Sequence, residues 1–169
     1  MREQQESGRG SQAPSHDEAQ QYERRYASPS ARLARNLPCI SPLSLCTCRW
    51  LFHGTDQDTV PKICATGVNR SFAGKNATMY GKGCYFARDS SYSSSTTYSR
   101  PNASGIQHMF LVRVVVGKYC LGKRDEPAPP PRKGHLLYDT TVNDEKNPAI
   151  FVTYHDAQVY PEYLVKFKQ

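Results

Sequence analysis

The sequence predicts an α+β fold, a strand-rich chain with short helices only in its first half. Apolar stretches with the length and composition of strands occur at 51–55, 84–87, 106–116, 150–154 and 160–168. Helical signals at 55–67 and 89–99 fall between the early strands, and the second half of the chain carries none. Because helices and strands do not alternate along the whole chain, the pattern favours α+β over an alternating parallel sheet.

Residues 1–48 differ in composition from the rest of the 169-residue chain. They are rich in Gln, Ser, Arg and Pro and contain no Lys, whereas most basic residues after Trp50 are Lys. Such a composition cannot bury enough apolar surface to offset the entropy of ordering, so this segment is predicted to be disordered. Cys39, Cys46 and Cys48 suggest metal ligands, but no fourth ligand follows at a zinc spacing, and thiols in a loop are the better interpretation.

Length and charge limit the functions that the chain can have. One domain, predicted at 49–169, fits the length. The net charge of +7 is scattered without a run of five basic residues, which disfavours a sequence-specific nucleic-acid partner but suits a pyrophosphate ligand. The chain shows no apolar run that could span a membrane and no signal-peptide core, so the six Cys predict reduced thiols in the nucleus or cytoplasm.

The strands at 51–55 and 84–87 are predicted to form a ligand cleft. The first fixes His53 in position, and Gly54 has no side chain, so a ligand can approach its backbone directly. Gly81 and Gly83 allow a sharp turn into the second strand, where Tyr85 lies on the opposite face from Phe86. The alternative is a hairpin-like pair with a core tyrosine and a satisfied histidine.

The elements around these strands follow from local signals. The helix has Thr55 or Asp56 as its N-cap and Gly67 as its stop, and its apolar stripe is Val60, Ile63 and Cys64. Residues 68–80 form a loop that would lie across a ligand. Asp89 or Ser90 caps a weak helix over 89–99 that Pro101 ends.

The second half of the chain is predicted to be strands and loops. The apolar run at 106–116 predicts a central strand covered on both faces. Prolines among charges predict an exposed loop over 117–134. A turn at His155-Asp156 separates the last two strands.

Several motifs in order carry a resemblance to a known family: His53-Gly54-Thr55, the stretches 69–76 and 80–87, and then 97–101, 137–140 and 158–164. Together they resemble the catalytic domain of the poly(ADP-ribose) polymerase family over residues 50–168, most closely its macrodomain-bearing and zinc-finger-bearing mono-ADP-ribosyltransferases. Family members carry a first strand and helix with Ile, Asn and Trp landmarks upstream, and residues 1–48 show none. The domain is therefore expected to lack both elements.

The resemblance implies a fold, a co-substrate and a site. The fold is the diphtheria-toxin-like ADP-ribosyltransferase fold, a split antiparallel β-sheet with short helices and NAD+ in the cleft between its halves, without a metal. His53 would bind the adenosine ribose, and the Gly54 backbone would bind the nicotinamide carboxamide, which Ser93 completes. Tyr85 and Tyr98 would stack on the nicotinamide ring. The NAD+ cleft also includes Thr55, Arg70, Phe72 and Ala73.

The third catalytic position is where the chain departs from the chain-elongating polymerases, because their glutamate falls on Ile150. Ile cannot act as a base, so the acceptor must bring its own nucleophile, and transfer should stop at one ADP-ribose. The resemblance thus implies an NAD+-dependent protein mono-ADP-ribosyltransferase whose acceptors are proteins and include the chain itself. The alternative is an inactive module that binds NAD, a nucleic acid or a protein partner.

Overall fold

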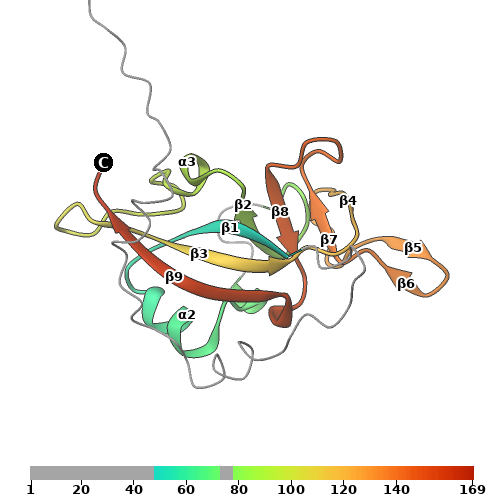
Figure 1. Cartoon of the computed structure of the whole chain (residues 1–169), viewed down its shortest axis with the longest axis horizontal. Coiled ribbons are helices and arrows are strands. Elements are labelled where there is room, and N and C mark those ends of the chain that lie inside the picture. The colour runs from blue at the N-terminus through green and yellow to red at the C-terminus, as the bar shows by residue number, and fades with distance from the viewer. Residues whose placement is uncertain (1–47, 73–77) are drawn as a thin grey trace, which may run out of the picture.

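The computed structural model describes residues 48–72 and 78–169. The predicted disordered segment lies outside the described residues except for Cys48, which begins the first strand. The structure contains one large sheet, a small two-stranded sheet and short helices (Figure 1). This arrangement agrees with the predicted α+β class.

The large sheet has seven strands in the order β4-β7-β8-β2-β1-β3-β9. Its strands are β1 (Cys48–Thr55), β2 (Cys84–Ala87), β3 (Gln107–Val115), β4 (Tyr119–Leu121), β7 (Thr140–Val142), β8 (Ile150–Thr153) and β9 (Val159–Phe167). All neighbours are antiparallel except β4 and β7. The strands predicted near the two motifs and at the C-terminal end are therefore confirmed, with bounds shifted by up to three residues.

The sheet is split between β1 and β2. These two strands pair at a single position, Phe52 with Ala87, whereas β1 pairs with β3 along its whole length, from Cys48 to Thr55. On the other side, β2 pairs with β8 over its four residues. The halves β1-β3-β9 and β4-β7-β8-β2 are thus paired as strands at one position only.

Short helices follow the early strands: α2 (Val60–Thr66), the 3-10 turn η2 (Arg70–Phe72) and α3 (Ser90–Ser93). A second 3-10 turn, η3 (Asp156–Gln158), lies between β8 and β9, where only a turn was predicted. Gly67 ends α2 as predicted, with φ 81° and its N–H donated to the carbonyl of Ile63 at 2.9 Å. The predicted N-cap was wrong: Thr59 occupies that position, and Asp56 Oδ1 accepts the Thr59 N–H at 2.7 Å.

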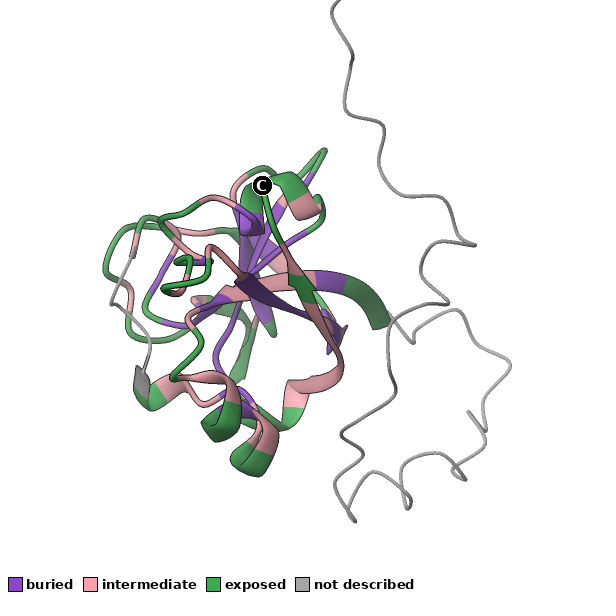
Figure 2. Ribbon diagram, turned by 90° about the vertical axis from the view of Figure 1, so that its left-hand side faces the viewer, coloured by how far each residue is buried: buried purple, intermediate pink, exposed green. Residues whose placement is uncertain are grey.

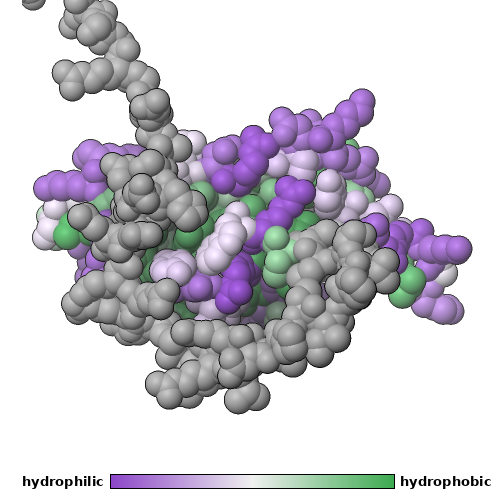
Figure 3. Space-filling view, viewed as in Figure 1, coloured by the Kyte–Doolittle hydropathy of each residue, from purple (hydrophilic) through white to green (hydrophobic). Residues whose placement is uncertain are grey.

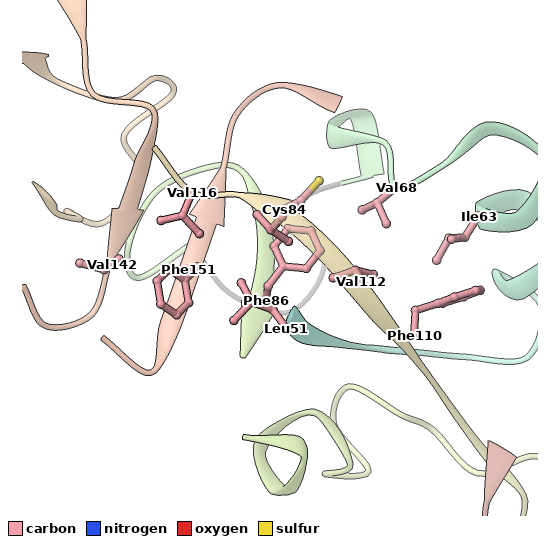
Figure 4. Packing of buried hydrophobic residues seen from close by; sticks show 11 residues of the cluster. Leu51, Ile63, Val68, Cys84, Phe86, Phe110, Val112, Val116, Val142 and Phe151 are labelled. Atoms are coloured by element: carbon pink, nitrogen blue, oxygen red, sulfur yellow. The ribbon is translucent and has the colours of Figure 1, made fainter. Parts of the chain in front are cut away.

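The hydrophobic core is continuous across the split. Phe86 and Phe151 on one half pack with Leu51 and Val112 on the other, and Ile63 of α2 joins the same cluster (Figure 4). Figure 2 shows the buried residues concentrated on the strands at the centre of the molecule. One core therefore holds both halves at a fixed distance around the cleft.

Two predictions in the second half of the chain were wrong. β3 is second from the edge of the sheet, and from Leu111 to Val115 partly or fully exposed residues alternate with buried ones, so one face is open there. The predicted loop 117–134 contains β4 and the start of a hairpin, β5 (Pro131–Lys133) with β6 (Leu136–Leu137), which projects from the sheet in Figure 1. Strands this short carry too little periodic pattern to be recognised.

Candidate functional site

A cleft opens where β1 and β2 part beyond the Phe52–Ala87 pair. Residues 53–55 of β1 line one side and residues 84–87 of β2 the other. Helices α3 and α2 lie on opposite sides of β1 (Figure 1), and both contribute to the lining. The space within the cleft is about 1180 Å³, open solvent included. The split in the sheet therefore creates the cleft.

Gly54 presents its backbone to this cleft. The carbonyl of Phe52 accepts the hydroxyl of Ser93 at 3.1 Å, so Phe52 directs its backbone polar groups toward α3 rather than toward β3. Backbone direction repeats every two residues in a strand, so the N–H and C=O of Gly54 point the same way, where β2 no longer pairs with β1. Gly54 thus offers a donor and an acceptor side by side.

The segment 93–99 forms the wall beside Gly54. A Cβ at Gly54 would lie 2.4 Å from the backbone oxygen of Ser93 and 2.9 Å from Cβ of Tyr98, which explains why this position must be glycine. Ser99 Oγ lies 2.7 Å from the Ser93 carbonyl, and Gln107 donates to the carbonyls of Ser94 and Ser99 at 2.8 and 2.6 Å. Buried hydrogen bonds to β3 therefore hold this wall in place.

His53 has a defined tautomer. Its Nδ1 lies 2.9 Å from the carbonyl oxygen of Tyr85, and a carbonyl can only accept, so Nδ1 carries the proton. Burial lowers the pKa of His53 below its usual value, an effect that the bond to Tyr85 only partly opposes. In the neutral ring Nε2 is a hydrogen-bond acceptor, and His53 lines the cleft.

Tyr85 is fixed at its hydroxyl and lines the cleft. The hydroxyl accepts the N–H of Tyr80 at 3.0 Å and donates to the carbonyl of Gly81 at 2.9 Å. Burial raises the pKa of the Tyr85 phenol, so it stays protonated at neutral pH. Its neighbour Phe86 is 1% exposed and points into the core, which confirms the predicted alternation along β2.

The ring of Tyr98 stacks on the ring of Tyr92. The ring centroids are 4.9 Å apart, the planes meet at 23°, and the two hydroxyls are 2.7 Å apart. Both residues line the cleft. The pKa of Tyr92 is raised by burial and by its bond to Tyr98. Sequence reasoning missed Tyr92, although an aromatic residue next to Ser93 was a signal that could have indicated it.

Ile150 lies in the cleft as the first residue of β8. It pairs with Ala87 of β2, is 5% exposed, and its N–H is donated to Asn143 Oδ1 at 2.8 Å. Among the described residues that line the cleft, the one carboxylate is Asp56, at the start of the segment leading to α2. The position aligned with the glutamate of the chain-elongating polymerases is therefore a buried aliphatic side chain, which cannot act as a base.

The remaining predicted residues divide into three groups. Thr55 is 5% exposed and lines the cleft. Arg70 is absent from the lining: its Nε donates to the carbonyl of Lys82 at 3.1 Å, and its Nη2 to the carbonyl of Pro127, so the structure does not bring it into the site. Ala73 and the Phe72 side chain lie outside the described part of the chain.

Two kinds of feature are absent from residues 48–72 and 78–169. Within these ranges, no group of three or more side chains is arranged to hold a metal ion. No helix there is long and apolar enough to cross a membrane.

The fold is one that solved structures also show. The crystal structure of the PARP domain of Arabidopsis RADICAL-INDUCED CELL DEATH1 is similar with a TM-score of 0.59 and 22% sequence identity, covering 73% of this chain and 68% of that one. The split sheet and the cleft at its division thus belong to the ADP-ribosyltransferase fold that the sequence predicted.

The chain belongs to the poly(ADP-ribose) polymerase catalytic domain family, whose model matches residues 12–169. Human protein mono-ADP-ribosyltransferase PARP14 is 48% identical over 122 residues, which are 70% of this chain and 7% of that protein. Mouse protein mono-ADP-ribosyltransferase PARP10 is 46% identical over 120 residues, 70% of this chain and 12% of that protein. The chain therefore spans a small part of the length of these relatives.

The family prediction is confirmed, including its closeness to mono-ADP-ribosyltransferases. Mouse protein mono-ADP-ribosyltransferase PARP11 is 38% identical over 136 residues, 69% of this chain and 41% of that protein. The family match begins at residue 12, upstream of the predicted boundary at residue 49. That boundary, and the predicted lack of a first strand and helix, stay predictions.

Proposed function

We propose that this chain is an NAD+-dependent protein mono-ADP-ribosyltransferase, which transfers one ADP-ribose from NAD+ to a protein side chain and releases nicotinamide. The observation that carries the proposal is the convergence of His53, Gly54, Tyr85, Ser93 and Tyr98 on one cleft. These residues come from three separate elements and a loop, and the division of the sheet brings them together.

The nicotinamide group would bind at the Gly54 end of the cleft. A carboxamide has an N–H donor and a C=O acceptor, and the Gly54 backbone offers their complements. The hydroxyl of Ser93, whose proton is donated to Phe52, keeps lone pairs that can accept the second amide proton. The rings of Tyr85 and Tyr98 provide the aromatic faces on which a cationic pyridinium stacks.

The adenosine ribose would meet His53. Because Nδ1 donates to the Tyr85 carbonyl, Nε2 is left to accept a hydrogen bond from a ribose hydroxyl. The low pKa of His53 favours this acceptor form at neutral pH. His53 therefore binds the co-substrate as a neutral acceptor.

Bond cleavage needs little from the protein beyond orientation. The bond between the ribose carbon and the nicotinamide nitrogen breaks, its electron pair leaves with nicotinamide, and the ribose passes through an oxocarbenium-like state. An acceptor nucleophile then forms the new bond to that carbon. With Ile150 at the cleft wall no base is supplied there, so a nucleophile that is already ionised, such as a carboxylate, suits this site best. A ribose hydroxyl would need a base, which is why chain growth is not expected.

The proposed acceptors are proteins, this chain among them, in the nucleus or cytoplasm. Cys64, Cys84 and Cys120 are free thiols, which supports a reducing compartment. A second candidate function is an inactive module that binds NAD+ without transferring it. The absence of a catalytic carboxylate at Ile150 is the observation that favours it.

Incubation with NAD+ labelled in its adenylate half separates the two candidates. The proposal predicts label that stays with the protein after denaturation and free nicotinamide in equal amount. The matched variants are Tyr98→Ala, which is expected to lose both, and Tyr138→Ala, which is expected to keep both because Tyr138 is a half-buried tyrosine outside the cleft. Binding of NAD+ with no label in the denatured protein would support the inactive module instead.

A further inference from the structure

A proline-rich stretch lies outside the cleft. It runs from Pro127 to Pro131, and Ala128 is its one residue that is not proline. The stretch leads directly into β5, and the hairpin that β5 forms with β6 projects from the sheet (Figure 1). Neither the stretch nor the hairpin contributes to the lining of the cleft.

The sequence of this stretch favours the polyproline II conformation. Each proline fixes its own φ at about −65°, and a residue that precedes proline is disfavoured in the helical region. Because Ala128, Pro129 and Pro130 each precede a proline, the two effects act on consecutive residues. A polyproline II helix has three residues per turn, so residues three apart, such as Pro127 and Pro130, lie on the same edge.

The burial of the stretch agrees with one edge against the protein and two edges toward solvent. Pro129 is buried, whereas Ala128 and Pro131 are exposed. Pro127 is also exposed, and Pro130 is half-buried. A partner can therefore reach the edge with residues 127 and 130 and the edge with residues 128 and 131 without displacing Pro129.

Hydrogen bonds to the backbone carbonyls hold the stretch in place. The carbonyl of Pro127 accepts the guanidinium of Arg70. The carbonyl of Pro130 accepts the N–H of Tyr138 at 3.1 Å. A stretch that is already fixed in an extended conformation loses little conformational entropy when it binds a partner.

Cationic and apolar side chains follow the stretch on its C-terminal side. Arg132 and Lys133 are exposed and form no ion pair with a carboxylate of residues 48–72 or 78–169. On the paired strand β6, Leu136 and Leu137 are 57% and 46% exposed. Figure 3 shows the projecting side of the molecule as mostly hydrophilic with a small apolar area.

We propose that residues 127–133 bind a protein domain that recognises polyproline II helices, through a groove that is lined by aromatic side chains and carries acidic residues at one end. Aromatic rings pack against the proline edges of such a helix, and a carboxylate can pair with Arg132 through two parallel hydrogen bonds. The nearest acidic residues, Asp125 and Glu126, precede the stretch, so the positive charge at its C-terminal end gives it a direction on the groove. Such binding leaves the cleft open and does not depend on the ligand of the cleft.

Calorimetric titration of purified SH3 and WW domains with the full chain tests the proposal. At least one domain is expected to bind. Pro127→Ala combined with Pro130→Ala should weaken its binding roughly 10-fold or more, since two rings on one edge are lost. Arg132→Glu should weaken it roughly 10-fold as well, because it places like charges together. All three substitutions keep the carbonyls that accept Arg70 and Tyr138, so the stretch should stay in place.

Pro101→Ala and Arg100→Glu are the matched controls, because both residues are exposed and lie outside the stretch. They should leave the binding unchanged, and every variant should keep the thermal unfolding curve of the unmodified chain. The proposal is overturned if no SH3 or WW domain binds, or if binding survives the loss of Pro127, Pro130 and Arg132. Equal weakening by the control variants would overturn it too, because the binding would then not depend on this stretch.

Discussion

Replacing Gly54 by alanine tests how the wall of the cleft is held. The new Cβ would lie 2.4 Å from the Ser93 carbonyl oxygen, 2.8 Å from Ser99 Oγ and 2.9 Å from Cβ of Tyr98. The first atom belongs to the backbone and cannot rotate away. Real Cβ contacts are essentially never shorter than 3.0 Å, so the Ser93 carbonyl must move by at least about 0.6 Å.

That displacement would move the wall, with the Tyr98 ring, away from a benzamide ring bound in the cleft. A gap of about 0.5–1 Å forfeits roughly a quarter to a half of a dispersion contact. Stacking one aromatic ring is worth about 1–3 kcal/mol, so benzamide should bind about 2- to 10-fold more weakly to Gly54→Ala. Overpacking should also lower the free energy of unfolding by about 1–3 kcal/mol.

The assay is benzamide titration by calorimetry beside a thermal unfolding curve. Gly134→Ala is the control, because Gly134 has φ +57° and open space around a Cβ, so alanine there strains the backbone far from the cleft without a clash. It should lower stability and leave benzamide binding intact. If folded Gly54→Ala binds benzamide as tightly as the unmodified chain, the account of this wall is wrong.

Three further predictions concern residues around the cleft. Tyr92→Phe keeps the stacked ring but loses the hydroxyl contact to Tyr98, so the affinity for benzamide should fall by less than about fivefold. Tyr92→Ala should lower that affinity further. An unchanged benzamide affinity in Tyr92→Ala would mean that Tyr92 does not support Tyr98. The pKa of His53 is lower in the folded state than in the unfolded state, so the unfolded state takes up a proton first and the free energy of unfolding should fall as pH drops below about 6.5. In denaturant titrations, His53→Gln should make the free energy of unfolding less dependent on pH. The same pH dependence in His53→Gln and the unmodified chain would contradict the burial of the ring. Arg70→Ala should lower the free energy of unfolding by about 1–3 kcal/mol, because the Arg70 guanidinium donates to backbone carbonyls, and it should leave the affinity for NAD+ unchanged. Weaker NAD+ binding in this variant would support the predicted role of Arg70 in the cleft.

The sequence predicted the strands at the cleft well because their local pattern and their motifs agree. Leu51 and Phe86 face the core and Tyr85 faces the cleft, as alternation along each strand requires. The sequence predicted that the lack of a side chain at Gly54 lets a ligand approach its backbone. The structure adds that its missing side chain also makes room for Ser93, a tertiary contact that no local pattern contains.

The sequence was less informative where long-range packing decides the outcome. The apolar run in β3 is typical of a central strand, yet β3 lies second from the edge of the sheet and its Val115 is 46% exposed. Arg70 lies in a family motif, but the direction of its guanidinium depends on carbonyls at Lys82 and Pro127. The stack of Tyr92 on Tyr98 depends on the turn after α3. That turn was not predicted, because a helix over 89–99 was expected where α3 is only four residues long.

The length of the ADP-ribose product tests the central claim most directly. The chain is incubated with NAD+, and the modified protein is digested with a phosphodiesterase, which releases AMP from terminal units and phosphoribosyl-AMP from internal ones. Because Ile150 supplies no base to activate a ribose hydroxyl, the account predicts AMP alone and a discrete band on a gel. Phosphoribosyl-AMP from the unmodified chain, together with a ladder on the gel, would contradict the assignment of single transfer to this cleft.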